Sequence, residues 1–522
     1  MNGAWQKNLK ISHKVTIESL FSRGVQSPVV GTFVMALMLS SCDFIRKSHG
    51  RETIFDRVIS IPKTLVLDIP KLSPLCDEIA GLKRGFVKVE NSKLYYEEEG
   101  SGIPLVMISG GPGETHHVFH PHFSNAKSFA QIIYYDQRGT GKSSTDDTGV
   151  TYTIRQAVED LESLRLALGI EKWAVLGWSY GGFLAQCYAL TYPERVIGLV
   201  LVAAGDGLRN VKMKPSRQGM FLSQAECDAI GKIWTKEHAG KLTLAQAGYN
   251  AHLAGNWKKQ NYYKPTPNEF VRAALYNWTP AQGFRSFIGQ DMLKISLDRQ
   301  FDDFEIPTLI FEGKWDLTWD SDKIDFMREN HPHARVEVFE KSGHAIFADE
   351  PEKFFRLLKE FLETSSKKTI TYKPGNRLTW PKPLSELACK VLMVTSLPDT
   401  EERAERLSEI YRQAIEENSK EADGWERLFF TFFYKKGEAK KALEALQRYE
   451  HLAKTQDPEK LKEYSHCIKV WRGQLLDLLG RRAEAIKCYQ EILRDFKYVN
   501  YNCGDVDRKW LEDHIKKPFA LD

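Results

Sequence analysis

The most constraining feature of this sequence is an alternation, between about residues 85 and 366, of short apolar runs with helix-length amphipathic segments. The runs are rich in β-branched and aromatic residues, which favour strands. Because such runs alternate with helical segments, we predict an α/β core with a mostly parallel sheet and helices on both faces. The expected strands are Phe86–Val89, Lys93–Tyr96, Leu105–Ile108, Ile132–Tyr135, Trp173–Leu176, Val196–Ala203, Thr308–Phe311 and Arg335–Phe339.

The alternation is interrupted at residues 206–300, which are rich in helix formers, Trp and Tyr and contain no strand run. A connection of this length inside a compact domain is usually functional and often forms a lid. We therefore predict a helical cap over 206–300, inserted into a core made of residues 85–205 and 301–366. Residues 43–84, which contain several prolines, are predicted to form an N-terminal arm.

The C-terminal part is predicted to be a separate, all-helical domain over residues 384–522, joined by a Lys-, Thr- and Pro-rich linker at 367–383. Three of its segments share a spacing of small and aromatic residues that resembles tetratricopeptide repeats. Such repeats would bind a protein partner, and an unrelated helical bundle is the alternative. The positions concerned are Leu407, Tyr411 and Ala414, then Ala442, Leu446 and Tyr449, then Ala485, Tyr489 and Ile492.

The first 42 residues have the pattern of a secretory leader, with basic residues before the apolar run Val29–Leu39. The sequence Leu39-Ser40-Ser41-Cys42 resembles the bacterial lipobox, in which the cysteine is lipidated. This resemblance implies a membrane-anchored lipoprotein of the bacterial cell envelope that faces the periplasm. The alternative is that the apolar run is a buried segment of a cytoplasmic protein.

Charge and cysteine content exclude several other classes of protein. The chain has 73 Lys and Arg against 69 Asp and Glu, a net charge of +4 over 522 residues, so nucleic acid is not an expected partner. The eight cysteines are scattered, with no Cys/His cluster at the spacing of a metal site. We therefore predict neither a metal nor a cofactor.

The most specific local motif is Gly177-Trp178-Ser179-Tyr180-Gly181-Gly182, between an expected strand and an expected helix. A G-x-S-x-G sequence in this context predicts a nucleophile elbow, in which crowding around a strained serine requires glycines on both sides. A second glycine turn, Ser109-Gly110-Gly111-Pro112-Gly113, follows another strand and is expected to supply an oxyanion-binding N–H beside that of Tyr180.

A serine nucleophile requires a base and an orienting acid, here in the chain order Ser, Asp or Glu, His. Asp316 and His344 follow two consecutive expected strands and would meet at one edge of the sheet. Glu312 and Asp320 are alternative acids. Four histidines near the second glycine turn are expected in a solvated loop, although they could line the mouth of the site: His116, His117, His120 and His122.

These motifs resemble the α/β-hydrolase superfamily over residues 85–365 and, more narrowly, the prolyl aminopeptidase (proline iminopeptidase) family. The markers are the two glycine turns and the string Asp136-Gln137-Arg138-Gly139-Thr140-Gly141-Lys142-Ser143, for which we expect a structural role. The resemblance implies that Ser179 is the nucleophile, His344 the general base and Asp316 the orienting acid. It also implies that the N–H groups of Gly111 and Tyr180 form the oxyanion hole.

The sequence departs from the family in two places. Ser109 replaces the histidine that usually precedes the G-G-P-G turn, and the cap lacks the usual Trp-Glu motif for binding the substrate's α-amine. Candidate amine-binding carboxylates are Glu226, Glu237, Glu269 and Asp291. We predict a serine hydrolase that releases an N-terminal residue, of the proline type, from small peptides. The alternatives are an esterase, lactonase or amidase with the same triad, acting on an acyl substrate, and a scaffold that acts through its helical repeats.

Overall fold

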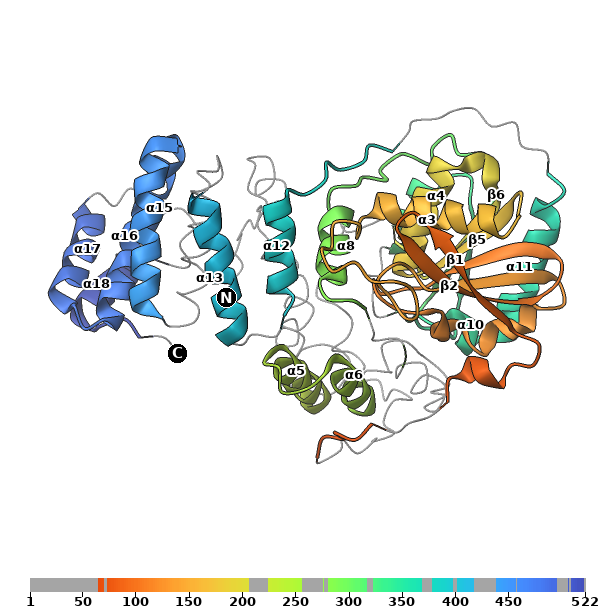
Figure 1. Ribbon diagram of the computed structural model, residues 1–522, viewed down its shortest axis with the longest axis horizontal. Coiled ribbons are helices and arrows are strands. Elements are labelled where there is room, and N and C mark those ends of the chain that lie inside the picture. Colours follow the sequence, from red (N-terminus) through yellow and green to blue (C-terminus); the bar gives the residue numbers. More distant parts are fainter. Residues whose placement is uncertain are drawn as a thin grey trace, which may run out of the picture. The chain divides into compact units, whose positions relative to one another are not determined.

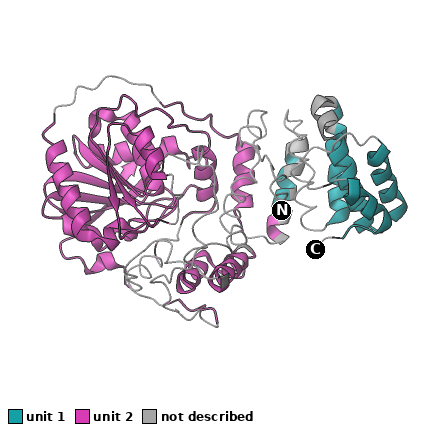
Figure 2. Ribbon diagram, turned by 180° about the vertical axis from the view of Figure 1, so that it is seen from behind, with its two compact units in different colours: residues 1–28, 404–522 teal, residues 29–403 magenta. Residues whose placement is uncertain are grey.

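The computed structural model describes residues 64–69, 73–205, 224–255, 276, 280–316, 323–368, 378–397, 401–416, 438–456, 458–494, 506 and 508–520. Its described residues fall into two compact units, which we call the sheet unit, within 29–403, and the helical unit, within 404–522 (Figure 2). The predicted leader, with Cys42, and the candidate Glu269 lie outside the described residues.

The sheet unit contains an eight-stranded sheet in the order β1-β2-β4-β3-β5-β6-β7-β8 (Figure 1). β1 and β2 pair antiparallel at one edge, β2 is antiparallel to β4, and the remaining pairs are parallel. Each strand contains or overlaps one of the eight predicted runs, so the prediction of a mostly parallel α/β sheet is confirmed. The strands are β1 (Lys83–Val89), β2 (Ser92–Gly100), β3 (Ile103–Ile108), β4 (Ala130–Tyr135), β5 (Trp173–Trp178), β6 (Val196–Val202), β7 (Thr308–Gly313) and β8 (Arg335–Phe339).

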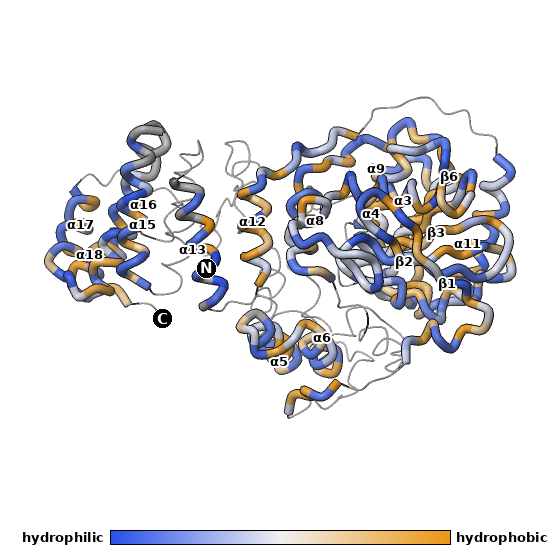
Figure 3. Tube along the Cα trace, viewed as in Figure 1, coloured by the Kyte–Doolittle hydropathy of each residue, from blue (hydrophilic) through white to orange (hydrophobic). Residues whose placement is uncertain are grey.

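The strands are rich in apolar residues (Figure 3). Their buried side chains join two cores, one on each face of the sheet, as uninterrupted apolar runs require. Along β3, Leu105 and Met107 join one core, whereas Val106 and Ile108 join the other, because successive side chains of a strand point to opposite faces. The helices that pack into the first core include α3 (Ile154–Ala167), α4 (Tyr180–Thr191), α8 (Phe284–Met292) and α9 (Lys323–Asn330). The second core contains residues of α10 (Ile346–Asp349) and α11 (Pro351–Ser365).

Short 3-10 helices precede the sheet and connect its strands. η2 (Leu75–Glu78) precedes β1, and η5 (Pro193–Arg195) precedes β6. η3 (His116–Phe119) and η4 (His122–Ala126) both lie in the connection from β3 to β4, directly after the second glycine turn.

The described part of the insertion between β6 and β7 is helical and contains α5 (Gln224–His238), α6 (Leu244–Leu253) and α8. α5 and α6 enclose a small apolar core of their own, against which Leu65 packs. Asn250 on α6 binds both the N–H and the carbonyl of Val66 through its side chain, at 2.8 and 2.9 Å. The N-terminal arm therefore contacts the cap.

The sheet unit continues past the predicted linker. Cys389 and Leu392, on α12 (Glu386–Thr395), belong to the same apolar core as α3 and α8. The predicted start of the C-terminal domain at residue 384 therefore precedes a helix that packs on the sheet unit, and the division between the units falls at Arg403.

The helical unit is built from consecutive helices that pack in chain order, with α15 on α16, α16 on α17 and α17 on α18. Six of the predicted core positions are fully buried there: Ala442, Leu446, Tyr449, Ala485, Tyr489 and Ile492. None of the described helices in either unit is long and apolar enough to cross a membrane. The helices are α13 (Glu401–Glu416), which spans the division, α15 (Ala439–Gln456), α16 (Pro458–Leu478), α17 (Arg482–Arg494) and α18 (Arg508–Lys516).

Candidate active site

Ser179 occupies a sharp turn between β5 and α4, with φ of 56° and ψ of −123°. This left-handed region is strained for a residue with a side chain, and such strain is concentrated at functional sites. The neighbouring glycines have no room for a side chain, because a Cβ on Gly177 would lie 2.2 Å from the carbonyl oxygen of Gly181. A Cβ on Gly181 would lie 2.1 Å from the carbonyl oxygen of Ile108. The predicted elbow is therefore present, and main-chain crowding explains its glycines.

The backbone of the elbow is fixed on both sides of the serine. The N–H of Ser179 donates to the carbonyl of Val202 at 2.9 Å, and the N–H of Gly182 donates to the carbonyl of Ser179 at 2.9 Å. Tyr180 is the first residue of α4, so its N–H has no partner within the helix. The positive end of the helix dipole lies at this point and favours developing negative charge.

Asp316 and His344 meet at the edge of the sheet where β7 and β8 end. His344 Nδ1 lies 2.8 Å from Asp316 Oδ2, and both side chains are buried. The indole N–H of Trp178 donates to the carbonyl of His344 at 3.0 Å, which places the histidine beside the elbow. Glu312, the alternative acid, instead pairs with Lys323 at 2.8 Å, and the other alternative, Asp320, lies outside the described residues.

The second glycine turn lies directly against the serine. A Cβ placed on Gly110 would lie 3.2 Å from Ser179 Cβ. Gly111 and Gly113 have φ of 113° and 102°, values that residues with side chains rarely adopt, so the turn requires both glycines. Ser109, at the position where the family has histidine, donates its hydroxyl to the carbonyl of Glu114 at 2.9 Å and so closes the turn.

Glu114 is a residue of this site that the sequence analysis missed. Its carboxylate also borders Gly110, since the same added Cβ would lie 2.7 Å from Glu114 Oε2. Burial raises the pKa of Glu114 to about 7, although the nearby His344 and Arg285 act in the opposite direction. The sequence feature that could have identified Glu114 is its position immediately after the G-G-P-G turn, which was expected at the edge of the sheet that carries Ser179.

Arg285, on α8, connects the insertion to the glycine turn. Its Nε donates to the carbonyl of Pro112 at 3.1 Å. Burial lowers the pKa of Arg285 to about 10, and the carboxylates of Glu114 and Glu237 oppose that shift. Charges of both signs therefore lie beside the serine.

The predicted amine-binding carboxylates are dispersed among the described residues of the insertion. Glu226 and Glu237 are both on α5, the first buried and the second partly buried. Asp291 accepts a hydrogen bond from the backbone N–H of Ile154 at 2.7 Å, where α3 begins. Its carboxylate therefore caps a helix of the core.

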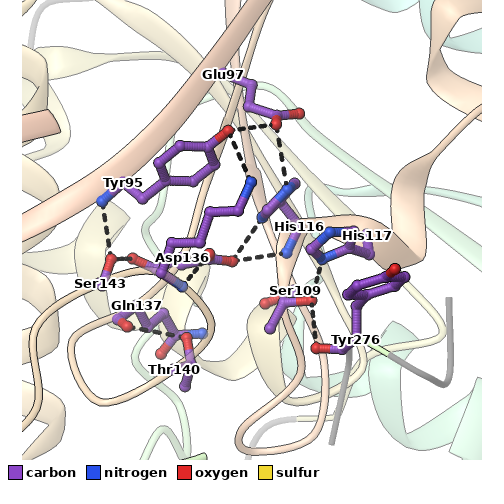
Figure 4. A network of polar contacts seen from close by, with 12 residues as sticks. Tyr95, Glu97, Ser109, His116, His117, Asp136, Gln137, Thr140, Ser143 and Tyr276 are labelled. Atoms are coloured by element: carbon purple, nitrogen blue, oxygen red, sulfur yellow. Dashed lines mark hydrogen bonds and ion pairs between the residues drawn. The ribbon is translucent and has the colours of Figure 1, made fainter. Parts of the chain in front are cut away.

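The expectation of a solvated histidine loop is wrong. His116, His117 and His120 are buried, and Glu97 of β2 lies 3.4 Å from His116 Nε2 and 3.0 Å from His120 Nε2. Figure 4 shows His116 between Asp136 and Glu97. Glu97 was not predicted as a partner of these histidines, because it comes from β2, which is distant from them in the sequence.

The predicted structural role of the D-Q-R-G string is confirmed. Asp136 accepts hydrogen bonds from the backbone N–H groups of His116 and Lys142, at 3.0 and 2.9 Å. Arg138 makes a buried two-pronged ion pair with Asp160 at 2.7 and 2.8 Å. These contacts hold the η3 connection and α3 around the sheet edge.

Comparisons with known proteins agree with this geometry. A family described as "alpha/beta hydrolase fold" matches residues 103–351. The chain is 32% identical over 278 residues to a proline iminopeptidase of Lactobacillus delbrueckii subsp. bulgaricus, covering 50% of this chain and 89% of the relative. It is 25% identical over 312 residues to a cis-3-alkyl-4-alkyloxetan-2-one decarboxylase of Shewanella oneidensis, covering 58% and 96%. Among solved structures, an esterase from Exiguobacterium antarcticum matches with a TM-score of 0.42 and 24% identity, covering 53% and 98%.

Proposed function

The chain belongs to the alpha/beta hydrolase fold family, and we propose that it is a serine hydrolase that releases an N-terminal residue, of the proline type, from small peptides. One observation carries the hydrolase part of this proposal. The buried pair of His344 and Asp316 lies beside a strained serine elbow, against which a glycine turn packs. The proline iminopeptidase relatives support the peptide substrate.

In the proposed mechanism the Ser179 hydroxyl attacks the scissile carbonyl while His344 Nε2 accepts its proton. Asp316 holds the other ring nitrogen and stabilises the imidazolium that forms. The N–H groups of Gly111 and Tyr180 donate to the oxyanion. The protonated His344 then gives its proton to the leaving amine, which leaves an acyl group on Ser179. Water, deprotonated by His344, hydrolyses this ester and regenerates the serine.

The aminopeptidase part requires a carboxylate for the substrate's ammonium group, because a charge is costly to bury without a partner. We propose Glu114 for this role, since its carboxylate and Ser179 border the same glycine. No hydrogen bond of the Glu114 carboxylate is found among the described residues, so it is available to the ligand. Glu226, Glu237, Glu269 and Asp291 remain the other candidates, although Asp291 already binds Ile154.

The test compares prolyl-4-nitroanilide, which carries a free amine, with 4-nitrophenyl acetate, which does not. We expect Glu114→Gln to raise KM for the anilide by about tenfold to a hundredfold, since a charged hydrogen bond is lost. KM for the ester should stay within about threefold, because no charge is lost in its binding. The exposed Glu171→Gln is the control. The four cap carboxylates are neutralised by substitution one at a time and tested in the same assay. Equal changes of KM for both substrates at all five positions, Glu114 included, would exclude the aminopeptidase.

An esterase, lactonase or amidase with the same triad is the second candidate. Arg285 is the observation that favours it, since this cation already lies near Glu114 and balances its charge without a substrate amine. Hydrolysis of 4-nitrophenyl esters with no activity on any aminoacyl anilide would establish this alternative.

We propose that the helical unit binds a protein partner through tetratricopeptide-like helix pairs, which its consecutive packing of α15 to α18 supports. Labelling of Ser179 by a fluorophosphonate separates an enzyme from a scaffold with an inactive hydrolase domain. Labelling of the wild type and not of Ser179→Ala is expected for the enzyme.

The membrane anchor at Cys42 remains a proposal from the sequence. Two or three acyl chains would hold the protein firmly at a bilayer, because each buried CH₂ contributes about 0.8 kcal/mol. We expect Cys42→Ser to release the protein from the membrane fraction, or to leave an unprocessed precursor, with unchanged specific activity. An unmodified Met1 on soluble protein, detected by mass spectrometry, would contradict the anchor and favour a cytoplasmic enzyme.

A further inference from the structure

We propose that Cys76, His116 and His117 form a buried binding site for a divalent transition-metal ion of the zinc type. A ligand atom from each of these three residues lies within 4.8 Å of the other two. Glu97 and His120 form a second such group with His116, so a carboxylate borders the site. All of these side chains are buried.

The two proposed histidine ligands are held in the orientation that a metal requires. His116 Nδ1 lies 2.7 Å from Asp136 Oδ1, and His117 Nδ1 lies 2.8 Å from Thr115 Oγ1. The opposite nitrogen of each ring, Nε2, is buried and has no hydrogen-bond partner among the described residues. Metal-binding histidines commonly donate their second ring nitrogen to a carboxylate or another oxygen, which fixes the tautomer and leaves the first nitrogen for the ion.

Glu97 borders the site. Its Oε1 lies 3.4 Å from His116 Nε2, so a carboxylate stands beside the nitrogen that would bind the ion. The second oxygen of Glu97 lies 3.0 Å from His120 Nε2, which holds the carboxylate in place.

The donors match zinc in chemistry and in charge. One thiolate and the bordering Glu97 carboxylate balance the charge of a divalent ion, and two neutral imidazoles complete a mixed sulfur and nitrogen set that zinc accepts. Tyr95 donates its hydroxyl to Glu97 Oε1 at 2.7 Å, and Arg84 Nε lies 3.4 Å from the same oxygen, so both support the carboxylate. Three protein ligands leave one position of a tetrahedral ion for water or another small ligand.

The site and the carboxylate that borders it join three segments that are distant in the sequence. Cys76 comes from η2, the bordering Glu97 from β2, and the two histidines from η3, directly after the glycine turn. An ion would therefore tie the segment before β1 to the connection that carries Gly111. This explains why residue spacing predicted no metal site, since no two of its three segments are adjacent in the chain.

The experiment measures metal in the full-length protein, purified without chelators. We expect about one zinc per chain by mass spectrometry of the digested protein. After removal of zinc, Co²⁺ should bind and give the visible bands of tetrahedral cobalt together with a sulfur-to-cobalt charge-transfer band. A wild-type protein that contains no metal and takes up neither ion would overturn the proposal and leave a hydrogen-bonded network without an ion.

Variants then identify the ligands. Cys76→Ser should abolish the charge-transfer band, and His117→Gln should reduce bound metal at least about tenfold, as loss of a ligand does. Cys389→Ser removes another buried free thiol and is the matched control, which should retain metal and spectrum. Cobalt spectra that Cys76→Ser leaves unchanged would also overturn the proposed ligand set. If a variant does not fold, the metal content and the cobalt spectrum of the wild-type protein still show whether the site binds a metal ion.

Discussion

The sheet edge that carries Ser179 and the histidine cluster around His116 are both buried, polar and close to the same glycine turn, yet they are built in opposite ways. At the sheet edge each functional residue follows its own strand within a short motif, and the serine is held in a strained conformation. In the histidine cluster the polar groups come from several segments, and each histidine has one ring nitrogen held by an oxygen and one buried ring nitrogen without a hydrogen-bond partner among the described residues. The contrast teaches that backbone strain marks the region that reacts, whereas side chains from distant segments hold the region that supports it.

This contrast makes a general prediction about substitutions. Changes at the sheet edge should remove activity and spare stability, because the reacting groups contribute little to packing. Changes in the cluster should reduce stability and spare the activity of the molecules that remain folded. The following four substitutions test the contrast, in order of decreasing effect.

Ser179→Ala has the largest expected effect. It removes the attacking hydroxyl, so kcat should fall by about 10⁶-fold on every hydrolysed substrate, while oxyanion and binding contributions remain. The free energy of unfolding should be unchanged or slightly raised. His344→Ala should lower kcat alike, and the double variant should be no worse than either single one. Retention of most activity would refute the assignment of the nucleophile.

Asp316→Asn should lower kcat by about 10⁴-fold, because an amide holds His344 in the wrong tautomer. The side chain keeps its shape, so KM and the melting temperature should change little. The matched substitution Glu312→Gln alters the alternative acid. A larger loss of kcat in Glu312→Gln than in Asp316→Asn would reverse their roles.

Asp136→Asn tests the supporting region. It replaces a buried carboxylate that accepts from two backbone N–H groups, so we expect a loss of about 3 kcal/mol in the free energy of unfolding. Chemical denaturation measures this loss, with the exposed Asp147→Asn as the control. kcat of the folded fraction should remain within about threefold. A loss of kcat without loss of stability would break the contrast between the two regions.

Asp146→Asn should have the smallest effect. Among the described residues its carboxylate bonds only Thr148 and Thr151, outside both regions, so it serves as a reference that is measured by pH. Hydrogen bonds from the side chains and backbones of Thr148 and Thr151 lower the pKa of Asp146 to about 2, against the burial that raises it. A lowered folded pKa stabilises the protein above the unfolded value, and that contribution is lost as pH falls from about 4 through the folded pKa of about 2. The variant should therefore cost roughly 1 kcal/mol at pH 7, allowing for partial exposure, and almost nothing at about pH 1, below the folded pKa. A difference that persists at about pH 1 would show a contribution unrelated to ionisation.

The sequence was sufficient for the strands, the elbow and the Asp316–His344 pair, because each depends on residues that are close in the chain. Ser179 is recognisable from its glycines, and Asp316 and His344 from the strands before them. Glu114 and the burial of His116 were not predicted, since they depend on which distant side chains the fold brings near. Glu97 illustrates the difficulty. Alternation along β2 buries it on the face where the histidines lie, but a charged residue in a strand is ordinarily expected at the surface.

The hydrogen bond from Arg285 to the carbonyl of Pro112 has a consequence for protein engineering. Insertions of this kind are often treated as exchangeable modules, grafted between relatives to alter the range of substrates. In this protein α8 of the insertion also supports the turn that contains Gly111. A graft that lacks an arginine at this position would leave that carbonyl without its donor and loosen the oxyanion hole, so a change intended for selectivity would lower turnover of every substrate. Chimeras should therefore retain Arg285 and exchange only the helices that precede it.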